Sequence, residues 1–411
     1  MAVEDESQVS AAEMQDSLGE LGLAMLGAGY AVTDIQSALE RSAKSANFDM
    51  VIGTLPSGIL IDCPQLARTR MYSQPSTTSL RWDQAADVGI AADAAGVGRP
   101  VSMWSGLLQK TLASKARYGS VLACLGSGMS SAAISVIFGI SVAGMIAATI
   151  FGVLVGAMMI WAGRWARLSS VLPLLCAFVV SAILFSIGDQ VGLGHSPLFA
   201  ICAPLVMLIP GATITNGVVE LAAGDMVSGS ARIASGLMIW AMLVLGIAGG
   251  AAVSRADFTT LGDVPASGFP AWAPWIALLV MAFGLHLFFS TGLVLTISTA
   301  VSLEVAYGLQ TLIKPATGAL VAAGLTAAVA LLASRIIERF QPRLPSIVTF
   351  RPAFWILVPG TMGVVTLTEM ATNQDTTGGV VWTVAATAIS IGIGVQVGAF
   401  LSEFIRPPAS R

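Results

Sequence analysis

The pattern of hydrophobic and polar positions divides the chain into two regions. Residues 1–117 hold 9 Lys/Arg and 13 Asp/Glu, whereas the longer remainder holds only 11 and 10. No charged residue occurs between Tyr118 and Gly163, a stretch of 46 residues. Because a helix needs about 20 apolar residues to cross a bilayer, this stretch predicts a tight hairpin of two membrane-spanning helices.

Further apolar blocks bring the prediction to ten membrane-spanning helices. The first set continues after the hairpin over residues 168–187, 197–223 and 230–253. A polar loop then leads to a second set, residues 271–289, 291–312, 316–334, 346–372 and 379–402. The least regular of the ten segments are 119–139, which is serine-rich, and 291–312, which contains Glu304.

The first region predicts a small soluble α/β domain. "SLGELGLAMLGAGY" has apolar residues at helical spacing, and Gly27 and Gly29 suit the end of that helix. "TDIQSALERSAKSAN" continues as an amphipathic helix with Thr33 or Asp34 as its cap. "FDMVIGTLPSGILIDC" predicts two strands around a Pro56–Gly58 turn, "TSLRW" a further strand and "DQAADVGIAADAAGVG" a helix. The stretch "DCPQLARTRMYSQPSTT" supports no assignment. The predicted domains are a cytosolic α/β domain with a helical lead-in over 1–117, and two five-helix transmembrane repeats over 118–255 and 267–404.

Composition and charge narrow the class of protein. Charged residues make up 10% of the chain, against about 25% in soluble domains, and the mean hydropathy is +0.82. We therefore expect a multi-pass protein of the cell membrane, with the lipid bilayer as a partner. The net charge of −3 gives no reason to invoke nucleic acid. The acidic start lacks the basic and apolar segments of a secretory signal, so we expect a cytosolic N-terminus.

Few residues could support enzymatic or metal chemistry. Four cysteines form no CxxC pair, which predicts neither a disulfide nor a zinc site. Only two histidines occur, and none precedes His195, so Ser57 and Cys63 cannot form a nucleophile–histidine pair within the first region. No GxxxxGK[ST] loop is present, which argues against an ATP-driven pump. We therefore expect that the protein is not an enzyme and that it binds neither a cofactor nor a metal.

An internal repeat relates the two membrane halves. Pro210-Gly211 and Pro359-Gly360 lie 149 residues apart, and the same shift carries Glu220 onto Glu369. Each copy holds about five predicted spans, so the second copy must enter the membrane upside down. With both termini inside, the cytoplasmic segments hold twelve Lys/Arg and the outer segments only Arg255 and Lys314. This positive-inside bias supports the ten-span topology.

The two Pro-Gly pairs predict broken helices near the middle of the membrane. Proline removes a backbone donor, and unpaired backbone at that depth is tolerated beside a cavity or other protein. We interpret the breaks as parts of a polar substrate site, although proline kinks also serve packing alone. The candidate substrate-binding residues that follow the breaks are Thr213, Asn216, Glu220, Thr361, Thr366 and Glu369.

Each candidate acidic residue of the membrane region has two possible roles. Glu220 and Glu369 could neutralise an ammonium group or carry a proton, or they could be solvated helix ends. Glu304 lies among apolar and small neighbours, where an ionisable residue is costly, and it is the candidate for proton coupling. The alternative is a Glu304 that lies near a helix end and bonds to a neighbour. Asp225 and Arg232 are expected to flank a cytoplasmic loop.

The chain resembles the threonine/serine exporter family. The resemblance rests on "GAGYAVTDIQSALERSAKSANFDMVIGTLPSGILIDC", "LIPGATITNGVVELAAGDMVSGSARIASGL" and "ILVPGTMGV", and it covers nearly all of residues 15–403. It implies a cytosolic N-terminal region, ten spans, and export of L-threonine and L-serine driven by the proton motive force. Its most specific part comprises Pro210, Gly211, Asn216, Glu220, Asp225, Gly229 and Arg232.

Three classes of function stay in competition at this point. The leading hypothesis is secondary active antiport of small polar amino acids, with the amino acid and protons as partners. A passive channel for small polar solutes, or a transporter of another small organic acid, would use the same broken helices. A membrane enzyme or sensor that uses the first region is the third. The sequence is also compatible with a homo-oligomer.

Overall fold

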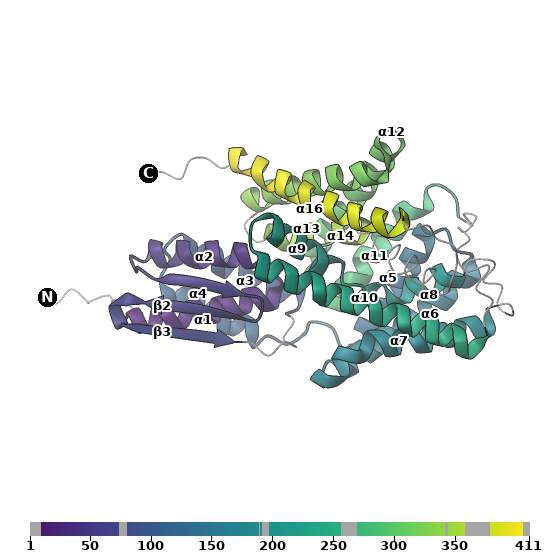
Figure 1. Ribbon diagram of the computed structural model, residues 1–411, viewed down its shortest axis with the longest axis horizontal. Coiled ribbons are helices and arrows are strands. Elements are labelled where there is room, and N and C mark those ends of the chain that lie inside the picture. The colour runs from purple at the N-terminus through teal and green to yellow at the C-terminus, as the bar shows by residue number, and fades with distance from the viewer. Residues whose placement is uncertain are drawn as a thin grey trace.

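The computed structural model describes residues 10–73, 80–188, 190, 197–255, 269–341, 344–357 and 379–405. It is mostly helical, with one three-stranded sheet in the N-terminal region (Figure 1). The N-terminal region lies at one end of the long axis, and the membrane-type helices fill the rest. The C-terminal end of α16 (Gly379–Ile405) points toward the N-terminal region.

Two helices open the N-terminal region. α1 (Ala11–Ala28) begins at Ser10, whose Oγ accepts a hydrogen bond from the Glu13 N–H at 3.2 Å. α1 ends at Gly29, whose φ of 82° favours glycine and confirms the helix end expected there. α2 (Val32–Ser45) has Ala31 in the cap position, two residues before Thr33 and three before Asp34, so the proposed Thr33 or Asp34 cap is wrong.

The sheet follows as a meander in the order β1–β2–β3, with all neighbours antiparallel. β1 (Val51–Leu55) and β2 (Gly58–Cys63) confirm the predicted hairpin. β3 (Arg68–Ser73) lies in "DCPQLARTRMYSQPSTT", the stretch left without a predicted element. The strand expected at "TSLRW" is wrong in its described part, because α3 (Trp82–Gly96) already begins there. α4 (Val101–Leu112) then leads to the membrane helices.

The first set of apolar helices contains the predicted hairpin. Small residues hold its two arms together, since Gly152 and Gly156 of the second helix face Ser131 and Ser127 of the first. A broken segment and two long helices follow. The elements are α5 (Ser120–Ile137), α6 (Val142–Ala162), α7 (Ala166–Ile187), α8 (Pro197–Leu205), η2 (Val206–Leu208), α9 (Gly211–Ala222) and α10 (Met226–Ser254).

The second set is less regular within the described residues. Its longest helix, α12, has 48 residues and contains Gly318, whose φ of 81° and ψ of 164° interrupt the helix. This break falls just after the expected boundary between the spans 291–312 and 316–334. The elements are α11 (Ala273–Phe289), α12 (Leu293–Phe340), α13 (Ser346–Phe350), α14 (Ala353–Leu357) and α16.

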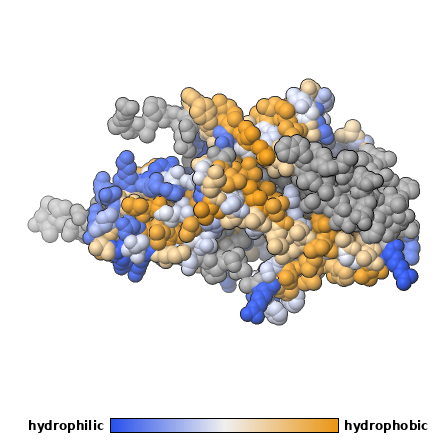
Figure 2. All heavy atoms as spheres, viewed as in Figure 1, coloured by the Kyte–Doolittle hydropathy of each residue, from blue (hydrophilic) through white to orange (hydrophobic). Residues whose placement is uncertain are grey.

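Among the described residues, six helices are long and apolar enough to cross a membrane, and the bent pair α8–α9 makes a seventh. The protein is therefore a membrane protein, and its outer face over these helices is largely hydrophobic (Figure 2). Ten spans were predicted. The difference arises because α11 is short, α12 covers two predicted spans, and most of the second half of the segment 346–372 lies outside the described residues.

The two membrane halves contain similar helix pairs. In the first, Gly246 and Gly250 of α10 meet α7 at Ala177 and Ser181, 69 residues earlier in each case. In the second, Gly394 and Gly398 of α16 meet the later part of α12 at Gly324 and Ala328, 70 residues earlier. Because the separation is constant along each pair, the two helices run parallel in both.

Candidate functional site

A cavity of about 280 Å³ lies where the N-terminal region meets the broken segment α8–α9. This volume is near the lower end of the range for small-molecule sites, roughly 300–1,000 Å³. Both regions contribute to its wall. The N-terminal region supplies Gly27, Ala28, Gly29, Leu80 and Trp82, and the membrane region supplies Val206, Met207, Ile209, Gly211, Thr213, Asn216, Arg232, Phe289, Arg351, Phe354 and Trp355.

The break at Pro210 gives the cavity its polar side. The helical segments before and after it are bent by 65°, and Pro210 occupies the cap position of α9. Gly211 and Thr213, in the first turn of α9, line the cavity. The N-terminal end of a helix carries partial positive charge, which favours an anionic group nearby. The first predicted break is therefore present and borders a cavity.

The residues after the break explain how an acidic and a basic side chain meet. Gly217 of α9 and Gly229 of α10 approach so closely that a Cβ on either would lie within 3 Å of the other's carbonyl oxygen. Gly224, with a φ of 90°, turns the chain between the two helices. Glu220 Oε1 consequently lies 2.9 Å from Arg232 Nε, and the Glu220 side chain is fully buried.

The loop between α1 and α2 lies directly on this ion pair. The Val32 N–H donates a hydrogen bond of 2.8 Å to Glu220 Oε1. Arg232 donates to the Tyr30 carbonyl at 3.0 Å, and Asn216 donates to the Gly29 carbonyl at 3.3 Å. Three polar side chains of the membrane region therefore bind three backbone groups within four residues of one short loop, Gly29 to Val32.

A second arginine binds the same loop from the other membrane half. Arg351, between α13 and α14, donates to the Ala28 carbonyl at 2.5 Å. A side chain at Gly29 would meet the Arg351 guanidinium, with a Cβ–nitrogen distance of 2.7 Å, so it would displace this arginine, and the φ of 82° also favours glycine there. Burial also raises the pKa of the neighbouring Tyr30 phenol, which stays neutral.

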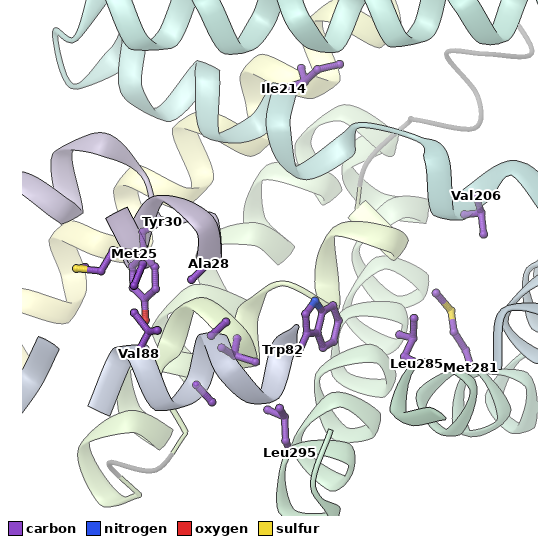
Figure 3. Close-up of a cluster of buried hydrophobic side chains, with 14 of the residues drawn as sticks. Met25, Ala28, Tyr30, Trp82, Val88, Val206, Ile214, Met281, Leu285 and Leu295 are labelled. Atoms are coloured by element: carbon purple, nitrogen blue, oxygen red, sulfur yellow. The ribbon is translucent and has the colours of Figure 1, made fainter. Parts of the chain in front are cut away.

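Aromatic rings close another side of the cavity. Trp82 stacks on Phe289 with ring centroids 4.5 Å apart and planes 5° apart, and it also stacks on Trp355 at 5.5 Å. Figure 3 shows Ala28, Tyr30 and Trp82 in one buried cluster with Leu285 and Leu295 of the membrane helices. The N-terminal region is thus packed into the membrane region at the cavity.

The structure brings together only part of the predicted site. Thr213 and Asn216 line the cavity, and Glu220 lies one helical turn beyond Asn216. The reading of Glu220 as a solvated helix end is wrong, because its side chain is fully buried. Glu304 is half-buried on α12 and is not among the described residues that line the cavity.

The second predicted half of the site cannot be compared with the first. Pro359, Gly360, Thr361, Thr366 and Glu369 lie outside the described residues. Their grouping with the first half stays a prediction from the repeat.

Sequence reasoning missed the two arginines of the site. Arg232 was expected to flank a loop, but it lies within α10 and reaches the cavity. Its place in the family motif, three residues after Gly229, was the available signal. Arg351 is one of the twelve Lys/Arg counted for the topology, and no part in the site was predicted for it. Asp225, the other expected loop residue, caps α10, since its Oδ1 accepts a hydrogen bond from the Ser228 N–H at 2.9 Å.

Comparison with known proteins supports the family resemblance of the motif around Pro210 and Glu220. The family model for the threonine/serine exporter ThrE matches residues 16–254, which is more than half of the chain. The chain belongs to the threonine/serine exporter family. The matched residues include most of the N-terminal region, the Pro210 break and the Glu220–Arg232 pair.

A curated relative gives a weaker match of the same kind. A protein of Mycobacterium tuberculosis named "Probable threonine/serine exporter" is 26% identical over 251 residues. The aligned part covers 56% of this chain and 46% of that protein, so the chain spans about half of the relative's length. No solved structure matches the chain.

The chemistry of the site suits a small zwitterion. Two guanidinium groups can bind a carboxylate, and a buried carboxylate can bind an ammonium group. Thr213 and Asn216 add hydroxyl and amide groups that could bind a polar side chain.

Proposed function

We propose that this member of the family is a secondary exporter of L-threonine and L-serine, driven by the proton motive force. The observation that carries the proposal is the cavity at the Pro210 break, which Arg232 and Arg351 line, with the buried carboxylate of Glu220 directly behind it against Arg232. Together these side chains supply both charges needed by an amino acid. Family membership supports the same substrate class.

We further propose ten spans in two inverted repeats. α12 would be about 72 Å long as one straight helix, more than twice the thickness of the hydrocarbon core, so the break at Gly318 fits two crossings. The parallel pairs α7–α10 and α12–α16 support equivalent helices in the two halves. α5 and α11, the first helix of each half, meet at Gly126 and Gly284.

The proposed orientation places both termini in the cytoplasm. It follows the excess of Lys/Arg in the segments that would be cytoplasmic, twelve against two. The cavity would then face the cytosolic side, next to the N-terminal region, where an exporter must take up its substrate. Glu304 is our proposed proton-coupling residue, because it is the acidic residue of α12 closest to the middle of the first predicted crossing of that helix.

Efflux from loaded cells tests the function. Cells that do or do not produce the protein are loaded with a threonine-containing dipeptide, and the excreted threonine is measured over time. We expect faster excretion with the protein, and an uncoupler should abolish the part that runs against a threonine gradient. Equal excretion in both strains would contradict the proposal, and efflux that only follows the gradient would indicate a channel. Parallel loading with small dicarboxylates tests whether an organic acid is preferred.

A further inference from the structure

The loop between α1 and α2 presents its peptide groups to charged side chains in a specific arrangement. The Tyr30 carbonyl accepts from Arg232, and two residues later the Val32 N–H donates to Glu220. Arg232 and Glu220 are themselves paired at 2.9 Å. One acceptor and one donor of the loop therefore face a cation and an anion that lie side by side.

A free amino acid carries the same two groups in charged form. Its carboxylate accepts hydrogen bonds from guanidinium groups, and its ammonium donates to a carboxylate. We propose that the α1–α2 loop is an internal substitute for the substrate: it occupies the positions at which the carboxylate and ammonium of a small α-amino acid bind, and the amino acid displaces it. This inference rests on the proposed function and assigns the N-terminal region the role of a gate.

The loop satisfies the charged side chains incompletely, which leaves room for a better ligand. Glu220 Oε2 is buried and has no hydrogen-bond partner among the described residues, because the loop offers Glu220 a single N–H. An ammonium group has three donors and a full charge, so it can bind both oxygens. Hydrogen bonds between two ionised groups are stronger than those to a neutral peptide, and the amino acid gains them at both ends.

The arrangement also sets the class of substrate. A ligand that competes with the loop needs a free carboxylate and a free ammonium group close together. The cavity beside the loop holds about 280 Å³ and is lined by Thr213 and Asn216, which suits a short polar side chain. Blocking either end of threonine should therefore prevent displacement of the loop.

Val32 offers a variant that weakens the loop without altering the cavity. Val32 is the first residue of α2, a position that proline favours, and Ala31 already has the extended backbone that precedes proline. Val32→Pro removes the N–H that Glu220 accepts and should leave α2 intact. Val32→Ala keeps the N–H and loses only side-chain packing, so it is the matched control.

Binding of radiolabelled L-threonine to the purified full-length chain is the main test. When its own loop blocks a site for part of the time, the apparent affinity of the site is proportional to the fraction of time that the site is free. Loss of one hydrogen bond to a charged group should lower the apparent Kd by about tenfold in Val32→Pro and leave it unchanged in Val32→Ala. Threonine methyl ester and N-acetylthreonine should compete poorly with both proteins.

Hydrogen exchange on the wild-type chain gives a second test that requires no substitution. Threonine should accelerate exchange of the amides of residues 29–32, because the loop leaves Glu220 and Arg232. Three results would each overturn the proposal. They are slower exchange in that loop, equal threonine affinity in Val32→Pro and Val32→Ala, and full competition by the methyl ester. If threonine is exported but these results appear, the proposed function stands and the gate fails. If the wild type neither binds nor exports threonine, both fail.

Discussion

Glu220 and Arg232 form an ion pair of 2.9 Å that joins α9 to α10, and the Glu220 side chain in it is fully buried. Gly217 and Gly229 allow the two helices to come this close. The pair also holds the N-terminal region, because the Val32 N–H and the Tyr30 carbonyl bind to it. One contact therefore connects the broken helix, the helix that follows it and the N-terminal region.

Removal of the acidic partner should destabilise the protein strongly. Glu220→Ala leaves Arg232 without its partner in a largely buried place, a change that costs about 3 kcal/mol or more. We expect a clearly lower thermal unfolding midpoint for the full chain in detergent. Asp83→Ala is the control, since it breaks the more exposed Arg81–Asp83 pair, which is worth about 1 kcal/mol or less. Equal shifts in the two variants would contradict a structural role for the Glu220 pair.

The contact between α5 and α11 should not tolerate even one added methyl group. A Cβ at Gly284 would lie 2.6 Å from the Gly126 carbonyl oxygen, and backbone cannot move aside easily. Gly284→Ala should cost about 1–3 kcal/mol through overpacking. Gly106→Ala adds the same group to α4 where nothing lies within 4 Å, and it should be neutral or slightly stabilising. Thermal unfolding monitored by size-exclusion chromatography compares them, and equal midpoints would be evidence against tight packing.

The N-terminal region should show a pH-dependent effect at Asp87. Burial raises the pKa of Asp87, the charge of Asp83 adds to this, and a hydrogen bond from Thr111 opposes it. A raised pKa in the folded state means that stability is present at low pH and is lost as pH rises through that pKa. Asp87→Asn should therefore be more stable than the wild type at pH 8, with the difference shrinking toward pH 4.

The control for this prediction is Glu40→Gln, which removes an exposed charge of α2. Its effect on the unfolding midpoint at pH 8 should be small, because the side chain is exposed. If Asp87→Asn is less stable than the wild type at pH 8, the hydrogen bond with Thr111 outweighs the cost of burying the charge.

Glu304 should affect coupling and leave substrate binding intact. It is half-buried on α12 and is not among the described residues that line the cavity. Glu304→Gln keeps the size of the side chain but cannot release a proton. We expect threonine efflux that no longer responds to an imposed pH gradient, with threonine binding within about twofold of the wild type. The control is Glu20→Gln, which changes an exposed residue of α1. If Glu304→Gln responds to the pH gradient as the wild type does, Glu304 is not the coupling residue.

Local patterns in the sequence were sufficient for much of the fold. The β1–β2 hairpin around Pro56–Gly58, the end of α1 at Gly29 and the break at Pro210 each depend on a few neighbouring residues. β3 was missed because Arg68–Ser73 is polar and mostly exposed, so its sequence lacks the alternation of apolar and polar residues that indicates a strand. It is a strand because it pairs with β2.

The docking of the N-terminal region could not be predicted in this way. Val32 and Glu220 are 188 residues apart, and Arg351 reaches the Ala28 carbonyl across 323 residues. A charged residue near a helix end is usually solvated, so nothing near Glu220 in the sequence indicates burial under a distant loop. The family motif was the one signal that grouped Asn216, Glu220 and Arg232, and it gave no role for the N-terminal loop.

Exchange of radiolabelled threonine across proteoliposomes tests most directly whether the cavity is the transport site. The wild type should exchange internal for external threonine with saturation. Thr213→Trp should abolish this exchange, because the larger side chain would fill a cavity of about 280 Å³. Thr311→Trp, on the exposed face of α12, should exchange at the wild-type rate. Wild-type exchange rates in a correctly folded Thr213→Trp protein would contradict the account.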